Sequence, residues 1–244
     1  MHRLPAETSL LMSQNVVLPK DAARHLKVLR PRQDEEVELF DGKGRTRTFR
    51  WDAASGILRA AAPAVEHPAP TSALTLFACV TKGSRWDWTI EKAVELGVSK
   101  IVPVISDRCI VRIAPSEREA KAERWRRVAE DAARQSDAVW LPQILAPVDF
   151  HNSLPLVAQS GRVFVGALVN PPAPPILQAV VGTGEPPQGD MGIFIGPEGD
   201  FTPEELSSLL ELATPVSLGP TILRAETAAI FGLSVLAACR VRFR

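Results

Sequence analysis

The stretch GIFIGPEGDFTPEE, residues 192–205, joins an apolar strand, a tight loop and the start of a helix. The apolar run has the length of a buried strand, and the GPEG that follows it is typical of a tight turn. Thr202 then offers a hydroxyl N-cap, Pro203 fits the first helical position, and Glu205 follows three residues after the cap. This order of strand, loop and helix is the repeating unit of a parallel α/β layer.

The same alternation continues along most of the chain. Strands are predicted at residues 74–80, 101–105, 162–169, 191–195 and 216–218, and helices at residues 89–96, 116–135 and 226–239 and from residue 203. Ser116 and Glu119 have capping-box spacing at the start of one of these helices. Residues 171–175 and 182–189 are rich in proline or glycine and are predicted as surface loops. Because alternation implies parallel crossovers, ligand sites are expected outside the carboxyl ends of the strands.

A proline-rich stretch, residues 63–72, marks a predicted domain boundary, since its three prolines remove backbone donors. Upstream of it, residues 37–40 and 46–51 are predicted as two strands around a glycine turn. The sequence therefore predicts a small β-rich domain of residues 1–70 and an α/β domain of residues 71–244.

The composition excludes several classes of protein. The 244 residues hold 28 Lys and Arg against 28 Asp and Glu, a balance that disfavours non-specific coating of nucleic acid. The three cysteines lack any paired or metal-ligand spacing, so we expect a reducing compartment, the cytoplasm. His2, His67 and His151 have no partners at ligand spacing, so we expect no metal site. No apolar run approaches the ~20 residues of a membrane helix, so no membrane association is expected.

Two loops carry the candidate chemistry, and each leaves two interpretations open. Gly196 and Gly199 let a ligand approach the backbone closely, or they simply make a strand-to-helix turn. The loop lacks the lysine of a phosphate-binding P-loop and does not match G-x-G-x-x-G. In the second loop, Glu226 fits the first turn of the last helix by its charge alone, whereas Arg224 is either an ordinary surface residue or a charge aimed at a ligand.

The last helix is apolar nearly all round, which predicts burial on every side. Its cover would come from the core of the same chain or from a second subunit. We favour dimerisation.

Longer motifs occur in a fixed order along the chain. They are HLKVLR at 25–30, LFDG at 39–42, KGSR at 82–85, EKAVELGV at 91–98, SDRC at 106–109, IGPEG at 195–199 and LGPTILRAETA at 218–228. Together they resemble the 16S ribosomal RNA (uracil-N3) methyltransferase family of the SPOUT class, and the resemblance covers nearly the whole chain.

The resemblance implies a PUA-like β-barrel followed by an α/β domain whose parallel sheet carries a C-terminal trefoil knot. It also implies a homodimer with the active site at the subunit interface, S-adenosylmethionine as cofactor, and 16S ribosomal RNA within the small ribosomal subunit as partner. By the motif match, the residues expected to bind the cofactor are Leu168, Ile195, Gly196, Pro197, Glu198, Gly199, Leu218, Gly219, Ile222, Leu223 and Arg224.

The implied reaction moves a methyl group from a sulfonium to N3 of uridine, which is a poor nucleophile until its proton leaves. We therefore expect Arg224 to stabilise the developing uridinate or an RNA phosphate, and Glu226 to orient the base or accept the proton. The basic residues expected to contact RNA are Arg24, Lys27, Arg30, Arg85 and Arg108.

Three positions depart from the family pattern. Asp200 stands where a second glycine is usual, Thr221 stands where an arginine often follows Gly-Pro, and residues 134–137 read RQSD in place of Glu-Gln-x-Gly-Arg. Two alternatives to the uridine methyltransferase stay open: a methyltransferase for another RNA, and a non-catalytic RNA-binding ribosome factor on the same fold. Retention of both loop motifs favours an enzyme.

Overall fold

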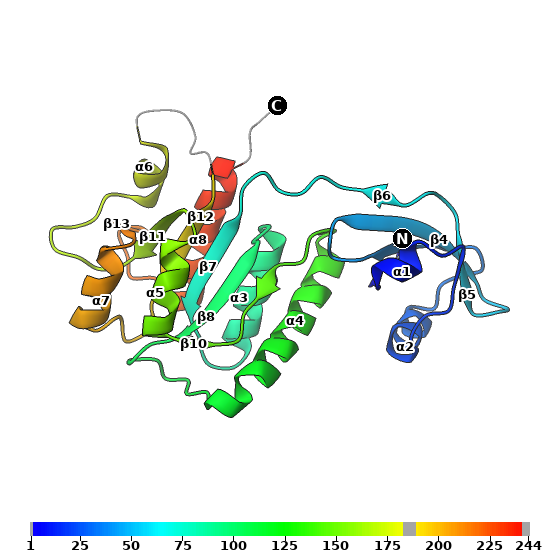
Figure 1. The fold of residues 1–244 in the computed structure, drawn as a ribbon, viewed down its shortest axis with the longest axis horizontal. Coiled ribbons are helices and arrows are strands. Elements are labelled where there is room, and N and C mark those ends of the chain that lie inside the picture. The colour runs from blue at the N-terminus through cyan, green and yellow to red at the C-terminus, as the bar shows by residue number, and fades with distance from the viewer. Residues whose placement is uncertain (1, 183–188, 241–244) are drawn as a thin grey trace. The chain divides into compact units, whose positions relative to one another are not determined.

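The computed structural model describes residues 2–182 and 189–240, so most of the predicted loop at 182–189 lies outside the described residues (Figure 1). The chain divides into two compact units. Unit 1 comprises Met1–Ala69 and Ala133–Leu141, and unit 2 comprises Pro70–Ala132 and Pro142–Arg244. The sequence placed the segment Ala133–Leu141 with the second domain, whereas its contacts assign it to unit 1.

Unit 1 is a small β-rich domain. Its central strands, β3 (Glu36–Phe40) and β4 (Arg45–Asp52), pair antiparallel around Gly42 and Gly44, which both have positive φ. This hairpin matches the strands predicted around a glycine turn. The other elements of unit 1 are β1 (His2–Pro5), α1 (Thr8–Leu11), β2 (Asn15–Val16), α2 (Lys20–Leu29), β5 (Ile57–Ala60) and β6 (Val65–Glu66), and the strand order is β1-β3-β4-β5-β2 with β6 beside β4.

Unit 2 is built on a parallel sheet, as the alternation of strands and helices predicts. The strand order is β10-β8-β7-β12-β11-β13, every pair along this path is parallel, and β9 also pairs with β8. The strands are β7 (Leu74–Cys79), β8 (Lys100–Ile105), β9 (Gln143–Ile144), β10 (Val148–Asp149), β11 (Arg162–Gly166), β12 (Met191–Ile195) and β13 (Thr214–Val216). The loops that follow β11, β12 and β13 therefore leave one edge of the sheet side by side.

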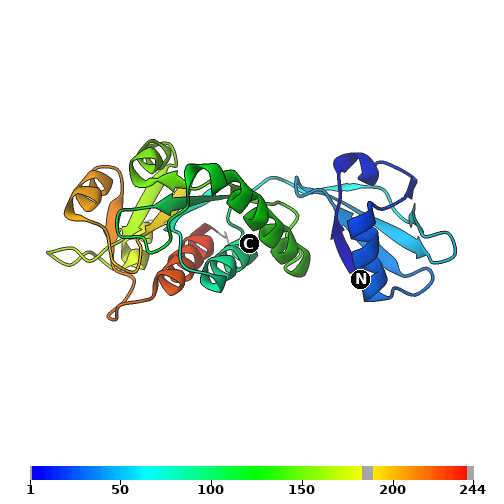
Figure 2. The same cartoon turned by 90° about the horizontal axis from the view of Figure 1, so that it is seen from below.

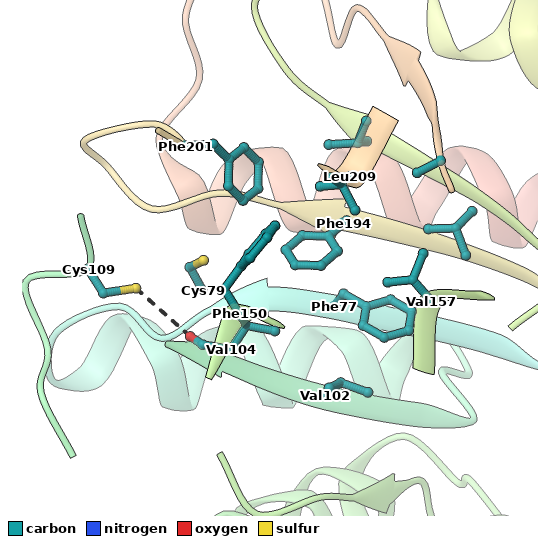
Figure 3. Close-up of a cluster of buried hydrophobic side chains, with 13 residues drawn as sticks. Phe77, Cys79, Val102, Val104, Cys109, Phe150, Val157, Phe194, Phe201 and Leu209 are labelled. Carbon is teal, nitrogen blue, oxygen red and sulfur yellow. Dashed lines mark hydrogen bonds between the residues drawn. The ribbon is translucent and has the colours of Figure 1, made fainter. Parts of the chain in front are cut away.

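Helices cover both faces of this sheet. Figure 2 shows α3 (Ser84–Glu95) and α8 (Ala225–Arg240) together on one side, and α5 (Phe150–Ala158) and α7 (Pro203–Leu210) on the other. Between the sheet and α5 lies an aromatic cluster in which the rings of Phe150 and Phe201 both lie against Phe194 of β12 (Figure 3). This packing attaches the loop after β12 to the core.

Several element boundaries differ from the predictions. Helix α3 begins at Ser84, five residues before the predicted start, and β11 and β13 end at Gly166 and Val216, two or three residues early. A short helix, α6 (Ile176–Val181), follows the predicted loop at 171–175. Because β11 and β13 end early, their loops are longer than the sequence indicates, and Leu168 and Leu218 belong to them.

The predicted start of the helix at 116–135 is wrong in detail. A 3-10 turn, η1 (Pro115–Glu117), precedes α4 (Arg118–Gln135), and Ser116 lies inside that turn. The carboxylate that bonds back to the chain is that of Glu117, which accepts the amide of Ala114 at 3.3 Å. Glu119 lies two residues further on and pairs with Arg126 instead. The proline at 115 shifts the first turn toward the N-terminus.

The fold of this single chain buries only part of α8. Residues on one face, among them Leu233 and Leu236, are fully buried, but Phe231 on another face is 42% exposed. In this chain alone, the helix therefore presents part of its apolar surface to solvent. Among the described residues, no helix is both long and apolar enough to cross a bilayer.

Candidate functional site

The loops after β11, β12 and β13 meet at Gly166. A Cβ atom at this glycine would lie 2.8 Å from Cδ1 of Leu218 and 3.1 Å from Cδ1 of Ile195. Because Gly166 has no side chain, Leu218 and Ile195 pack closely against the end of β11, which brings the two predicted cofactor loops together. Sequence reasoning did not identify Gly166, although its place at the end of an apolar strand is a usable signal.

The loop after β12 turns back so that its end enters the core. Gly196 packs against the ring of Phe201, whose edge would lie 2.9 Å from a Cβ at that glycine. Asp200, the departure from the family pattern, has φ +60, a conformation that aspartate tolerates better than most residues. Its Oδ1 accepts the amide of Phe201 at 2.8 Å. The aspartate thus preserves the turn that a glycine would make.

The loop after β8 forms hydrogen bonds to this turn. The Arg108 guanidinium donates to the carbonyls of Gly199 and Phe201, both at 3.2 Å. Glu205 of α7 is 2% exposed, and its two carboxylate oxygens accept the amides of Asp107 at 2.9 Å and Thr202 at 3.0 Å. Thr202 in turn caps α7 by accepting the amide of Glu205, as the sequence predicts. Glu205 therefore joins the start of α7 to the loop that carries Arg108.

An arginine and two carboxylates form the charged part of the site. Arg85, in the first turn of α3, places Nη1 3.5 Å from Oε1 of Glu198 and Nε 3.9 Å from Oε1 of Glu226. The Glu226 side chain is 12% exposed, and its Oε2 is buried without a hydrogen-bond partner among the described residues. A buried carboxylate oxygen with no protein donor is available to accept a proton or a hydrogen bond from a ligand.

Several predicted residues of the loops after β11 and β13 face solvent. Arg224 is exposed, and its guanidinium has no hydrogen bond or ion pair with the described residues. Ile222 is 85% exposed and Leu168 is 70% exposed, which is unusual for large apolar side chains. A Cβ at Gly219 would meet no described atom within 4 Å, so space is open beside this loop.

The predicted RNA-contacting residues fall into two groups. Arg85 and Arg108 belong to unit 2 and take part in the contacts described above. Arg24, Lys27 and Arg30 lie along α2 and at its C-terminal cap in unit 1, and all three are exposed. Their RNA contacts stay a prediction.

Two cysteines lie beneath the loop after β8. Cys79 ends β7, and Cys109 lies three residues from Ser106, whose amide and hydroxyl both approach the Cys109 sulfur at 3.3 Å. Hydrogen bonding from the Cys79 thiol, then from Ser106, lowers the pKa of the Cys109 thiol to about 6. Burial raises the pKa of the Cys79 thiol. Sequence spacing gave no sign of this pair, because the strands that bring it together are adjacent only in the fold.

A family model described as an RNA methyltransferase domain matches residues 67–237. The chain belongs to this RNA methyltransferase family. Curated relatives agree: the ribosomal RNA small subunit methyltransferase E of Mycobacterium bovis is 32% identical over 86% of this chain and 80% of its own length. The protein of the same name from Synechocystis is 30% identical over 96% of this chain and 76% of its own length.

Solved structures share the fold along nearly the whole chain. A ribosomal RNA small subunit methyltransferase E from Neisseria gonorrhoeae, bound to S-adenosyl methionine, superposes with a TM-score of 0.82 at 30% identity, covering 98% of this chain and 97% of that one. A methyltransferase structure from Legionella pneumophila with bound SAM gives the same TM-score at 28% identity, with coverage of 97% and 96%.

Proposed function

We propose that this RNA methyltransferase uses S-adenosylmethionine to methylate N3 of a uridine in 16S ribosomal RNA of the small ribosomal subunit. The observation that carries the proposal is the convergence of three strand-end loops at Gly166, with the buried carboxylate of Glu226 beside them. The names of the Mycobacterium and Synechocystis relatives support ribosomal RNA as the substrate. The resemblance to the uracil-N3 family supports N3 of uridine as the atom that receives the methyl group.

The residues present fit S-adenosylmethionine. Gly219 leaves the backbone accessible, and the exposed side chains of Leu168 and Ile222 offer apolar cover for an adenine ring. Pro197, Leu223 and the backbone of Gly196, Gly199 and Leu218 complete the proposed cofactor contacts. When bound, the cofactor supplies a methyl group on a positively charged sulfur.

The chain's own residues prepare the uridine. N3 must lose its proton before it can form a bond to carbon, and the free Oε2 of Glu226 is the proposed acceptor of that proton. Arg85 keeps the carboxylate of Glu226 oriented through its contact with Oε1. Arg224, whose guanidinium has no partner in the described part of the chain, is the proposed cation for the negative charge that spreads over the uracil ring.

The remaining features of the family belong to the same proposal: a PUA-like barrel in unit 1, a trefoil knot in the C-terminal third, a cytoplasmic location and a homodimer. The half-exposed Phe231 on the apolar helix α8 supports the dimer, because association would bury it. Sedimentation of the wild type and of Phe231→Glu tests this point. A monomeric wild type would contradict it.

The test of the activity is transfer of labelled methyl from S-adenosylmethionine to unmodified small ribosomal subunits and to the stripped RNA, with mass spectrometry of the nucleosides. We expect 3-methyluridine from the subunits. Methylation at another atom of the RNA would contradict the proposed site of transfer. No transfer to either substrate with intact cofactor binding would support a methyltransferase for another RNA, and no cofactor binding would support the non-catalytic factor.

Variants test the proposed roles. Glu226→Gln keeps the shape of the side chain but removes the proton acceptor, so kcat should fall by about 10²-fold or more while cofactor binding persists. Arg224→Ala should also lower kcat, through loss of the cation. Glu211→Gln removes an exposed carboxylate of unit 2 outside the site, so kcat and cofactor binding should stay those of the wild type. Wild-type rates for Glu226→Gln would refute its role.

A further inference from the structure

A hollow of unit 2 opens at the carboxyl ends of β7 and β8. Its volume is about 700 Å³, within the range of roughly 300–1,000 Å³ typical of small-molecule pockets. The loop after β7, the first turn of α3, the loop after β8 and α4 all contribute to its wall. None of the cofactor contacts proposed above lies in this wall.

The charges of the pocket favour an anion. Four cations line it against two carboxylates: Lys82, Arg112, Lys121 and Arg124 against Asp87 and Glu117. Two of the cations are already engaged, since Arg124 pairs with Asp87 and Arg112 donates to the carbonyls of Ser106 and Asp107. Lys82 and Lys121 are exposed, and their ammonium groups have no partner among the described residues. They are therefore free to bind a ligand.

The start of α3 adds to this preference. The helix is twelve residues long and its N-cap is Gly83, so no side chain caps the amides of the first turn. Space is open beside Gly83, where a Cβ would meet no described atom within 4 Å. Helix N-termini carry a partial positive charge and unsatisfied amide donors, and both attract phosphate groups.

Two buried polar atoms in the pocket wall lack partners. The hydroxyl of Thr81 and the indole nitrogen of Trp86 form no hydrogen bond with the described residues, although these side chains are only 4% and 2% exposed. A buried donor without a partner costs about 1–3 kcal/mol. Their retention beside a cationic pocket indicates that a ligand with acceptor atoms completes the site.

We propose that this pocket binds a backbone phosphate and the adjoining nucleotide of the RNA strand that carries the reacting uridine. The proposal rests on the proposed function, because it supplies a binding subsite for that substrate. The KGSR segment joins the two sites: Lys82 lines the pocket, whereas Arg85 lies between Glu198 and Glu226. A strand bound in the pocket would place a neighbouring nucleotide near those carboxylates.

The test compares the wild type with the double variant Lys82→Ala/Lys121→Ala. We expect the KM for small subunits to rise about tenfold or more, and the affinity for a single-stranded oligouridine to fall similarly. The salt dependence of oligouridine binding should become shallower by about one phosphate contact per lysine. The dissociation constant for S-adenosylmethionine should stay that of the wild type.

A matched control removes two positive charges of unit 2 outside the pocket. Lys92 pairs with Glu91 and Glu95, and Arg127 is 75% exposed on α4, so Lys92→Ala/Arg127→Ala should leave KM and oligouridine affinity near wild type. Equal losses in the two double variants would overturn the proposal, since they would report net charge alone. Unchanged oligouridine affinity in Lys82→Ala/Lys121→Ala would also overturn it.

Further arms separate the possible ligands. If AMP bound to the wild type and only the affinity for AMP fell in the double variant, the pocket would bind a free nucleotide and not the RNA strand. If cofactor affinity fell instead, the pocket would belong to the cofactor. Should the wild type methylate no uridine, the proposed function fails, yet oligouridine binding still decides the pocket.

Thr81→Val separates an effect on RNA binding from an effect on folding. The substitution keeps the shape and removes an unpaired buried hydroxyl, so stability should stay level or rise. We expect oligouridine affinity to fall severalfold at the same time. Lower stability with unchanged RNA affinity would mean that the hydroxyl serves the fold and would remove this support.

Discussion

Removing the carboxylate of Glu205 should weaken both the fold of unit 2 and the loops proposed to bind the cofactor. The side chain is 2% exposed, and each of its oxygens accepts one backbone amide, from Asp107 and from Thr202. In Glu205→Ala both amides lose their partner. Hydrogen bonds to a charged group contribute about 1.5–3 kcal/mol each, so the free energy of unfolding should fall by about 3–5 kcal/mol.

Glu205→Gln should fall between the alanine variant and the wild type. The amide oxygen can still accept one backbone N–H, but the new NH₂ group faces the other N–H, and two donors cannot pair. We expect a loss of about 2–3 kcal/mol. Glu204 occupies the same first turn of α7 and is exposed, so Glu204→Ala loses only its interaction with the helix dipole, about 0.3–1 kcal/mol.

Urea unfolding at equilibrium, followed by circular dichroism and by fluorescence, measures these differences, and agreement of the two probes tests for a single transition. Calorimetry with S-adenosylmethionine should show weaker binding by both Glu205 variants, because Asp107 anchors the loop whose Arg108 holds the turn after β12. The reasoning is refuted if Glu205→Ala costs no more stability than Glu204→Ala.

Three further outcomes are expected. Arg108→Ala removes both hydrogen bonds to the turn after β12, so calorimetry should show a cofactor dissociation constant raised about tenfold, with little loss of stability. Gly44 has φ +89, and a Cβ there would lie 2.3 Å from the Trp140 ring, so Gly44→Ala should lower the free energy of unfolding by about 2 kcal/mol or more in urea titrations. The pKa of Cys109 falls from 9.0 in the unfolded chain to about 6 in the fold, so the unfolded state binds more protons between these values. Stability should therefore rise with pH across this window, by up to about 1.4 kcal/mol per unit, and be lost as pH falls through about 6. Cys109→Ser should flatten that slope, whereas Cys239→Ser should not.

The sequence predicts the layered part of the fold because that part depends on local patterns. The apolar runs at β7, β8 and β12 and the Thr202 cap of α7 each follow from a few neighbouring residues. The sequence does not decide features that depend on a distant contact. The face of α8 that carries Phe231 is apolar by composition, but exposure depends on which elements the fold places beside it.

The candidate site also depends on contacts between residues that are distant in the sequence. Motifs name Arg85, Glu198 and Glu226 from segments far apart in the chain, and only the parallel sheet brings their charges within 4 Å. Motifs also mark Asp200 as a departure, whereas its positive φ and its bond to the Phe201 amide make it a working replacement for glycine. A substitution that breaks a pattern can preserve a conformation.

Glu205 and Thr81 illustrate two kinds of buried polar group that sequence alone cannot distinguish. Both side chains are almost fully buried close to strand ends of unit 2. Every acceptor of Glu205 is used by the chain itself, so its purpose is structural and its loss should appear in stability. The hydroxyl of Thr81 has no partner in the described chain, so it costs stability as it stands, and its loss should appear in binding. We therefore expect Glu205→Ala to lower the free energy of unfolding, and Thr81→Val to leave it level or raise it while weakening RNA binding. This contrast tests one principle: buried polar groups without a partner in the protein indicate where its ligand binds.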